Sequence, residues 1–369
     1  MRKLPLRKRI AFILIADLVA LGAIAVLGEV VCRIFSPQAD YQAVSDANDP
    51  ILQLSDNPYM GFELRADVAG HNSDGFRGRQ YARAKPDSAW RIVTLGDSVT
   101  YGLGVEAAEA FPAVLETKLN REVRRPEDTA APEPVEVLNF GTPGYSTFQS
   151  YTLLQTRAMR YEPDLVVLTF APDDVETSPV VINVDGRMCL FRNQLEGVGL
   201  LNNSVHWAVF RRSHFYRLLY RGAVLARTPS KARFNDVYVH PEVAWQNVRR
   251  FDALCRSEQT AFLLVLSPWL RPHFRPDKDA DPRACEAPEM LLDADVMQRY
   301  DQALDEIRRF ARESNVEFLD LGPLYEEHAG KMKLRPIDHE HLGPEGHRLV
   351  AEALCKKVLS MRSADNVRP

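Results

Sequence analysis

The sequence predicts an α/β fold in which a five-stranded parallel sheet lies between two layers of helices, preceded by one N-terminal transmembrane helix. Three observations support this prediction. Short apolar runs alternate with segments of helical spacing over residues 90–362, as in parallel sheets covered on both faces. A basic N-terminus precedes a long apolar stretch. Polar or small residues follow three of the predicted strands, at the edge where such sheets bind ligands.

The N-terminal stretch over residues 10–35 is long enough to cross the roughly 30 Å hydrocarbon core of a membrane as a helix. Five basic residues precede it: Arg2, Lys3, Arg7, Lys8 and Arg9. This positive charge favours a cytoplasmic N-terminus. Residues 1–35 are therefore expected to form a basic tail and a signal anchor, single-pass in the inner membrane, with the rest of the chain in the periplasm or another extracytoplasmic space.

Two acidic residues, Asp17 and Glu29, interrupt the apolar stretch. A carboxylate at the bilayer centre costs about 2.5–3.5 kcal/mol on insertion scales, so Asp17 is expected near the inner headgroups or against a partner helix. A cleaved signal peptide with Ala23-Ile24-Ala25 as the small-residue site is the alternative. The apolar character continues to Val31, which favours the uncleaved anchor.

The elements of the main domain follow in order along the chain. Short apolar runs predict five strands, at 91–95, 135–138, 165–170, 262–267 and 316–321. Helical spacing predicts helices over 111–123, 147–161, 241–257, 296–312 and 344–359. The run at 165–170 is apolar at nearly every position, which is typical of a strand buried on both faces.

Residues 36–89 are expected to form a linker and a covering segment before the hydrolase-like domain at 90–362. The part over 37–58 is polar and turn-rich, which predicts a linker. The denser part after it is expected to pack on the main domain through Phe62 and Phe76. A direct substrate contact by Asn72 or Arg77 is the alternative.

Insertions are predicted at about 176–240 and 271–293, where the strand–helix rhythm stops. The first holds aromatic residues interleaved with arginines. It is expected to pack on the main domain, and the alternative is a substrate cap or a membrane-facing surface. Cys189 and Cys285 lie in the two insertions and could pair in an oxidising compartment. Cys255 and Cys355 fall in predicted helices and are expected to be buried.

Two motifs carry the candidate chemistry. Gly96-Asp97-Ser98 follows the first predicted strand, so Ser98 is expected at its tip. Asp338 precedes His341 by three positions near the far end of the chain. Ser, His and Asp are the parts of a hydrolytic triad, whose members occur in different chain orders on unrelated folds. His339 is a rival base, but its spacing from Asp338 and the residues that follow favour His341.

These motifs resemble the sequence blocks of the SGNH/GDSL hydrolases. Four stretches match in order: Gly96-Asp97-Ser98, Asn139-Phe140-Gly141, Ala171-Pro172-Asp173-Asp174 and Asp338-x-x-His341. The resemblance implies the flavodoxin-like fold of that family, with Ser98 as nucleophile, His341 as base and Asp338 as its orienting acid. It also implies an oxyanion hole formed by the N–H groups of Ser98 and Gly141 and by the side chain at position 173.

Position 173 departs from the family pattern, which has an asparagine there. An ionised Asp173 only accepts hydrogen bonds, and its charge opposes a developing oxyanion. A protonated Asp173 could donate, with the charge of neighbouring Asp174 raising its pKa. Losing one oxyanion donor typically costs about 100- to 1000-fold in rate. The resemblance therefore implies the fold more firmly than full activity.

The leading hypothesis is a serine esterase that removes O-acyl groups, acetyl among them, from a cell-envelope glycan or lipid. An O-acyltransferase acting on an extracytoplasmic polysaccharide would use the same triad, and a non-catalytic glycan-binding or assembly protein is the second alternative. The net charge of −4 gives no sign of nucleic-acid binding. No CxxC motif or His/Cys cluster suggests a metal site, and no cofactor is expected. The expected partners are the acylated substrate, the membrane and a possible membrane protein of unknown identity.

Overall fold

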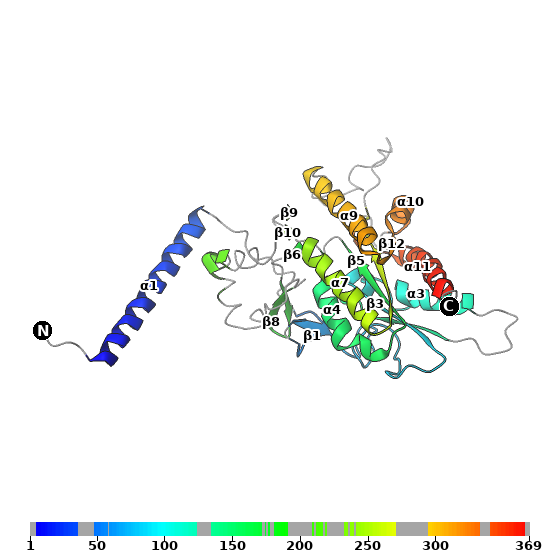
Figure 1. The fold of residues 1–369 in the computed structure, drawn as a ribbon, viewed down its shortest axis with the longest axis horizontal. Helices are drawn as coiled ribbons and strands as arrows, with labels where there is room; N and C mark the ends of the chain where they lie inside the picture. The colour runs from blue at the N-terminus through cyan, green and yellow to red at the C-terminus, as the bar shows by residue number, and fades with distance from the viewer. Residues whose placement is uncertain are drawn as a thin grey trace.

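The chain's architecture is taken from a computed structural model. It describes residues 5–35, 48–57, 59–123, 134–171, 174, 176–177, 181–190, 209, 212–216, 218–219, 232–234, 237–239, 241–270, 294–332 and 340–365. Helix α1 (Leu6–Phe35) projects away from the body of the molecule (Figure 1). Within the described part of the chain, its residues Arg7–Phe35 form the one helix long and apolar enough to cross a membrane.

The body of the molecule is built on the predicted five-stranded parallel sheet. The strand order is β12-β11-β5-β3-β4, and every neighbouring pair is parallel. Its strands are β3 (Trp90–Leu95), β4 (Val135–Asn139), β5 (Leu165–Phe170), β11 (Ala261–Leu266) and β12 (Glu317–Asp320). The central strand β5 is buried along its whole length, as its continuous apolar sequence predicts.

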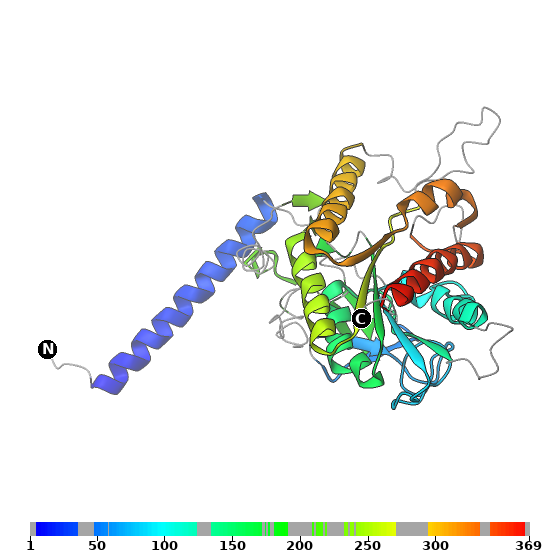
Figure 2. The same cartoon turned by 45° about the vertical axis from the view of Figure 1, so that its right-hand side comes forward.

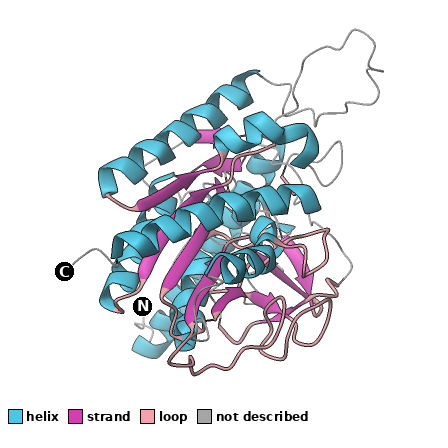
Figure 3. Ribbon diagram, turned by 90° about the vertical axis from the view of Figure 1, so that its right-hand side faces the viewer, coloured by secondary structure: helices cyan, strands magenta, loops and turns pink. Residues whose placement is uncertain are grey.

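Helices cover both faces of this sheet and complete three layers (Figure 3). One face carries α4 (Thr147–Thr156), α7 (Pro241–Ser257) and α9 (Ala294–Ser314). The other carries α3 (Phe111–Val123), α10 (Gly322–Met332) and α11 (Pro344–Asp365). Successive side chains of a strand point to opposite faces. On β5, Val166 and Leu168 therefore join the first core, and Leu165 and Val167 join the second.

Two helical segments differ from the sequence prediction. The helix predicted over 147–161 ends at Thr156, and the chain continues as the 3₁₀ helix η1 (Ala158–Tyr161). Its tighter hydrogen bonds run from the Arg160 N–H to the Arg157 carbonyl, at 3.2 Å. Helix α10 was not predicted, because its Gly322-Pro323 start resembles a loop. A proline at the beginning of a helix is nevertheless well tolerated.

The covering segment packs on the first core. Strands β1 (Leu52–Leu54) and β2 (Phe62–Leu64) pair antiparallel. Phe62 and Phe76 are fully buried, as predicted, and the Phe76 ring stacks on Phe140 with 4.5 Å between centroids. Leu52 is also buried. The expected linker over 37–58 is therefore wrong at its end, because an apolar residue there completes the core.

Parts of the first insertion also have regular structure. Strands β7 (Val181–Val184) and β8 (Arg187–Leu190) form an antiparallel hairpin. The covering segment holds this hairpin by an ion pair of 2.7 Å between Arg65 and Asp185. A separate small sheet has the order β6-β10-β9, from Glu176–Thr177, Val237–Val239 and Ala232–Phe234.

Four of the five cysteines lie in the described residues, and one of them, Cys32, is buried on α1. Cys255 and Cys355 are buried in helices, as predicted. Cys189 is buried in β8 rather than in irregular chain. Its pairing with Cys285 stays a prediction, since residue 285 lies outside the described residues.

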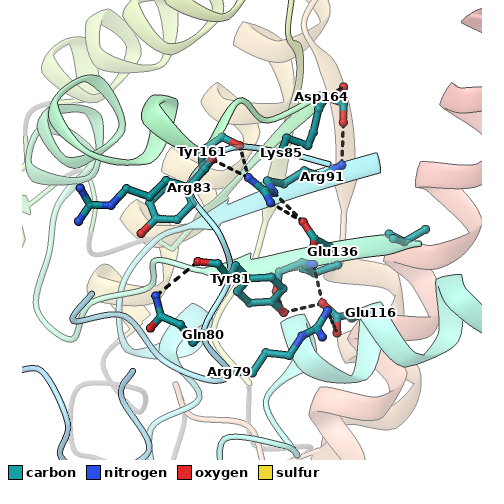
Figure 4. A network of polar contacts seen from close by, with 12 residues as sticks. Arg79, Gln80, Tyr81, Arg83, Lys85, Arg91, Glu116, Glu136, Tyr161 and Asp164 are labelled. Carbon is teal, nitrogen blue, oxygen red and sulfur yellow. Dashed lines mark hydrogen bonds and ion pairs between the residues drawn. The ribbon is translucent and has the colours of Figure 1, made fainter. Parts of the chain in front are cut away.

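A polar network fixes the N-terminal edge of the sheet (Figure 4). The fully buried Arg91 donates to Glu136 Oε2 from Nε at 2.8 Å and from Nη2 at 2.6 Å. Its Nη1 donates to the carbonyl oxygens of Arg83 at 3.0 Å and Tyr161 at 2.7 Å. The Asp164 carboxylate accepts the Arg91 backbone N–H at 2.7 Å. The buried Arg91 side chain is thus hydrogen-bonded at the N-terminal ends of the strands. The candidate site lies at their opposite, carboxyl ends.

Candidate active site

The turn that presents Ser98 depends on a glycine. Gly96 follows β3 with φ of 150°, a conformation that side chains disfavour. A Cβ there would lie 2.3 Å from Thr100 Oγ1 and 2.9 Å from the Thr169 carbonyl oxygen. The short helix α2 (Ser98–Tyr101) starts directly afterwards, and the Asp97 side chain caps it by accepting the Val99 N–H at 2.8 Å. Asp97 therefore stabilises the turn.

Ser98 and His341 meet although they lie 243 residues apart in the chain. The distance between Ser98 Oγ and His341 Nε2 is 3.0 Å, within the reach that a general base requires. His341 lies just before α11 and is half-buried, as is Ser98. Asp338 and the rival base His339 lie outside the described residues. The role of Asp338 as the orienting acid therefore stays a prediction.

Gly141 lies where the loop after β4 touches α2. A Cβ on Gly141 would lie 2.3 Å from the Tyr101 nitrogen and 2.6 Å from the Thr100 carbonyl carbon, so only glycine permits this approach. Its N–H donates to Asn139 Oδ1 at 2.9 Å. This N–H therefore already has an acceptor within the protein. To bind an oxyanion, it would have to form a bifurcated hydrogen bond, or the Asn139 side chain would have to move away. Its place in the oxyanion hole stays a prediction.

The other two predicted oxyanion donors differ in how the structure presents them. The Ser98 N–H is at the first position of α2, where a helix offers no internal acceptor. Asp173 lies outside the described residues, so its role stays a prediction. Its neighbour Asp174 is buried and accepts the Ala171 N–H at 2.9 Å. The Asp174 carboxylate therefore shapes the loop that follows β5.

The model of the GDSL-like lipase/acylhydrolase family matches residues 94–349, which is more than half of the chain. The chain belongs to this family. It is accordingly a hydrolase of ester bonds, and the match spans Ser98, Gly141 and His341. A search of curated proteins finds no match.

Several solved structures resemble this GDSL-family chain at low identity. A catalytic mutant of Axe2, an acetylxylan esterase from Geobacillus stearothermophilus, is 14% identical with a TM-score of 0.44, over 74% of this chain and 96% of its own. The hydrolase LAE5 from the Lake Arreo metagenome is 17% identical with a TM-score of 0.42, over 73% and 95%. A lipase/acylhydrolase from Enterococcus faecalis is 15% identical with a TM-score of 0.42, over 73% and 95%.

In this GDSL-family site, two residues hold α2 in place, a role that the sequence did not predict for either of them. The buried Asn139 donates from Nδ2 to the Thr100 carbonyl at 3.0 Å. Arg77 donates from Nη1 to the Gly102 carbonyl at 2.7 Å and from Nη2 to the Val105 carbonyl at 2.5 Å. Both side chains bind the backbone at the end of α2. They therefore fix the position of the helix that carries Ser98.

The substrate-contact alternative for the covering segment does not fit these bonds. The Arg77 guanidinium is buried and directed at backbone carbonyls. Asn72 is buried as well. Its Oδ1 accepts the Asp74 and Phe76 N–H groups at 3.1 and 3.2 Å, and its Nδ2 donates to the Arg79 carbonyl at 3.0 Å. Asn72 therefore stabilises the turn of the covering segment, and Arg77 joins this segment to the end of α2.

His347 lies on α11, six residues beyond the candidate base, and has a structural role. It is buried, and its Nδ1 accepts the Phe111 N–H at 3.2 Å. Burial, together with the charges of Arg77 and His341, lowers the pKa of His347 to about 3. The imidazole is therefore neutral at pH 7. Among the described residues, no group of three or more His, Cys, Asp or Glu side chains could hold a metal ion.

Proposed function

We propose that this protein is a membrane-anchored serine esterase that removes O-acyl groups from a glycan or lipid of the cell envelope. The observation that carries the proposal is the 3.0 Å contact between Ser98 Oγ and His341 Nε2. The contact lies at the carboxyl edge of a parallel sheet, where α/β folds bind their ligands. The family match supports the ester-cleaving chemistry.

The chemistry follows from the residue types. Ser98 Oγ attacks the ester carbonyl while His341 Nε2 takes the hydroxyl proton. The C–O bond to the alcohol then breaks, and His341 returns the proton to the leaving oxygen. Water attacks the resulting acyl-serine, with His341 again acting as base. Asp338 would hold the His341 tautomer by accepting a hydrogen bond from Nδ1.

The proposed location rests on α1 and on the charges that precede it. The apolar side chains of α1 are exposed along its length. Arg7, Lys8 and Arg9 gather at its beginning, which favours a cytoplasmic N-terminus. The esterase domain would then act outside the cytoplasm, next to the membrane.

Hydrolysis of p-nitrophenyl acetate and of longer p-nitrophenyl esters tests this proposal. Ser98→Ala and His341→Ala should each reduce kcat/KM by about 1000-fold or more. Ser257→Ala, which removes an exposed serine at the end of α7, is the matched control and should leave the rate unchanged. His339→Ala tests the rival base and should also retain activity.

A folded wild type with no hydrolysis, or an active Ser98→Ala variant, would contradict the esterase proposal. Acyl transfer is separated from hydrolysis by adding an acyl donor and a glycan acceptor and identifying the acylated product. The carboxyl group at Asp173 favours one further candidate, a glycan-binding protein without catalysis. In that case Ser98→Ala would leave the cellular role of the protein intact.

A further inference from the structure

The C-terminal end of α1 is bound by a short segment of the first insertion. This segment lies beside that end of the helix in both Figure 1 and Figure 2. The Glu29 carboxylate accepts three hydrogen bonds from it: Ser213 Oγ at 2.8 Å, the Phe215 N–H at 3.0 Å and the His214 N–H at 3.1 Å. Arg33 adds a bond of 2.9 Å from Nη2 to the Arg212 carbonyl. Glu29, one of the two acidic residues that interrupt the apolar stretch, is thus hydrogen-bonded by a segment of the first insertion.

Packing supports the same contact from a neighbouring position. A Cβ on Gly28 would lie 2.7 to 2.8 Å from three atoms of the Phe215 ring, so glycine lets the ring rest on the helix backbone. Cys32 lies one turn further along the same face and is only 4% exposed. We call this set the clasp: Gly28, Glu29, Cys32 and Arg33 of α1 with residues 212–216. It combines polar and apolar contacts on one helix face.

If α1 spans the membrane, the position of the clasp along α1 gives its depth in the bilayer. About 20 helical residues cross the hydrocarbon core, which places Glu29 near its outer boundary when counted from Ile10. Three apolar side chains next to the clasp are exposed: Val209 at 40%, Leu218 at 43% and Leu219 at 55%. Residues 214–216 and 218–219 are helical. Exposed apolar side chains on a helix at this depth are typical of segments that lie in the membrane interface.

We propose that Val209, Leu218 and Leu219 insert into the outer lipid interface, and that the clasp holds them there. The esterase domain then contacts the membrane at two places, through α1 and through this segment. Lipid is the occupant because the clasp joins this segment to the end of α1, where the apolar side chains of Val30, Val31 and Ile34 are also exposed, at 49%, 45% and 63%. The inference rests on the membrane anchoring in the proposed function and favours a substrate held close to the bilayer.

Photo-crosslinking of the full chain in phosphatidylcholine/phosphatidylglycerol nanodiscs tests this proposal. The photoreactive residue p-benzoylphenylalanine is placed at Leu219, at Leu18 within α1, or at Tyr59 on the covering segment, and lipid adducts are measured by intact mass. Tyr59 is 40% exposed and serves as the negative control. Adducts are expected at Leu219 and Leu18, with a yield at Tyr59 at least several-fold lower.

A matched pair of glycines in α1 tests the clasp. Gly28→Leu should push the Phe215 ring away and lower the Leu219 lipid adduct several-fold. Gly22→Leu should leave the adduct unchanged, because a Cβ on Gly22 would have nothing within 4 Å of it among the described residues. The Leu18 adduct and the hydrolysis of p-nitrophenyl acetate should stay unchanged in both variants.

Three results would overturn the proposal, and they can be told apart. An adduct at Leu18 without one at Leu219 removes the second membrane contact and leaves the anchor. An equal Leu219 adduct in Gly28→Leu and Gly22→Leu shows that the clasp does not hold the segment. Adducts at neither position overturn the anchoring as well, while hydrolysis of the soluble ester reports independently on the esterase proposal.

Discussion

The guanidinium carbon of Arg77 lies 4.1 Å from the centre of the Tyr101 ring, at the end of the short helix that begins with Ser98. The same guanidinium donates to the Tyr101 carbonyl at 3.2 Å. His71, from the same covering segment, lies 2.8 Å from the Tyr101 hydroxyl through Nε2. Its Nδ1 faces the Arg65 carbonyl at 2.7 Å and must donate to it, so Nε2 accepts a hydrogen bond from the Tyr101 hydroxyl. The covering segment thus supports the nucleophile without contacting it.

Arg77→Lys should lower kcat with little change in KM. A lysine ammonium cannot reproduce the planar set of donors that reaches several carbonyls. A small displacement of the nucleophile costs about 10- to 100-fold in rate. Arg79→Lys is the matched control, since Arg79 also stacks on a tyrosine, Tyr81 at 4.4 Å, but its side chain is 58% exposed. An equal loss in both variants, or a rise in KM alone, would contradict a positioning role.

The sequence predicted the parts of the site that depend on local pattern. Apolar runs placed the strands, and the end of a strand placed Ser98. Arg77 and Asn139 could not be assigned in this way, because they bind carbonyls 24 to 39 positions away in the chain. Backbone carbonyls are present at every residue and leave no sequence signal. Such partners become visible only when the fold brings them together.

Glu29 shows the same limit at the membrane. In the sequence it is an acidic interruption of an apolar helix, with no indication that a distant segment binds it. One of its partners, Arg33, is four positions away on the same helix, but its other three hydrogen bonds come from residues 184 to 186 positions away, in an insertion without clear periodicity. Gly28 likewise resembles Gly22 in the sequence, and only packing against Phe215 separates them. A long-range contact of this kind follows from the fold, not from composition.

Asp173→Asn should raise the hydrolysis rate about tenfold, because an amide can donate to the oxyanion and removes an opposing charge. Asp174→Asn is the matched control. The Asp174 carboxylate accepts the Ala171 N–H, and an amide oxygen can accept it as well, so the rate of this variant should stay within about threefold. Initial rates on p-nitrophenyl acetate give the comparison. A large loss in Asp173→Asn would instead assign this carboxyl group a specific role.

Glu136→Ala should lower the free energy of unfolding by about 3–5 kcal/mol, because it leaves the buried Arg91 without its counter-charge. Glu345→Ala removes one of the two carboxylates that pair with Arg348, at 2.7 Å; the other is Glu352. Both side chains of that pair are about half exposed, so the loss should be much smaller than in Glu136→Ala. Urea unfolding of residues 36–369 measures both. Equal losses would show that burial does not decide the strength of these pairs.

His347 should make the fold sensitive to acid. Burial lowers its pKa from 6.5 to about 3, so between these pH values the unfolded chain binds a proton that the folded chain does not. The stability due to this group is therefore complete above pH 6.5 and is lost as the pH falls toward 3. At pH 5 the loss relative to pH 7.5 amounts to about 2 kcal/mol.

His347→Asn should remove that loss while keeping an acceptor for the Phe111 N–H, since the amide oxygen can take the place of Nδ1. The free energy of unfolding of residues 36–369 is measured in urea at pH 7.5 and pH 5 for both proteins. The wild type should lose about 2 kcal/mol more than the variant over this interval. Equal losses would mean that protonated His347 is tolerated in the fold, and that other groups cause the acid sensitivity.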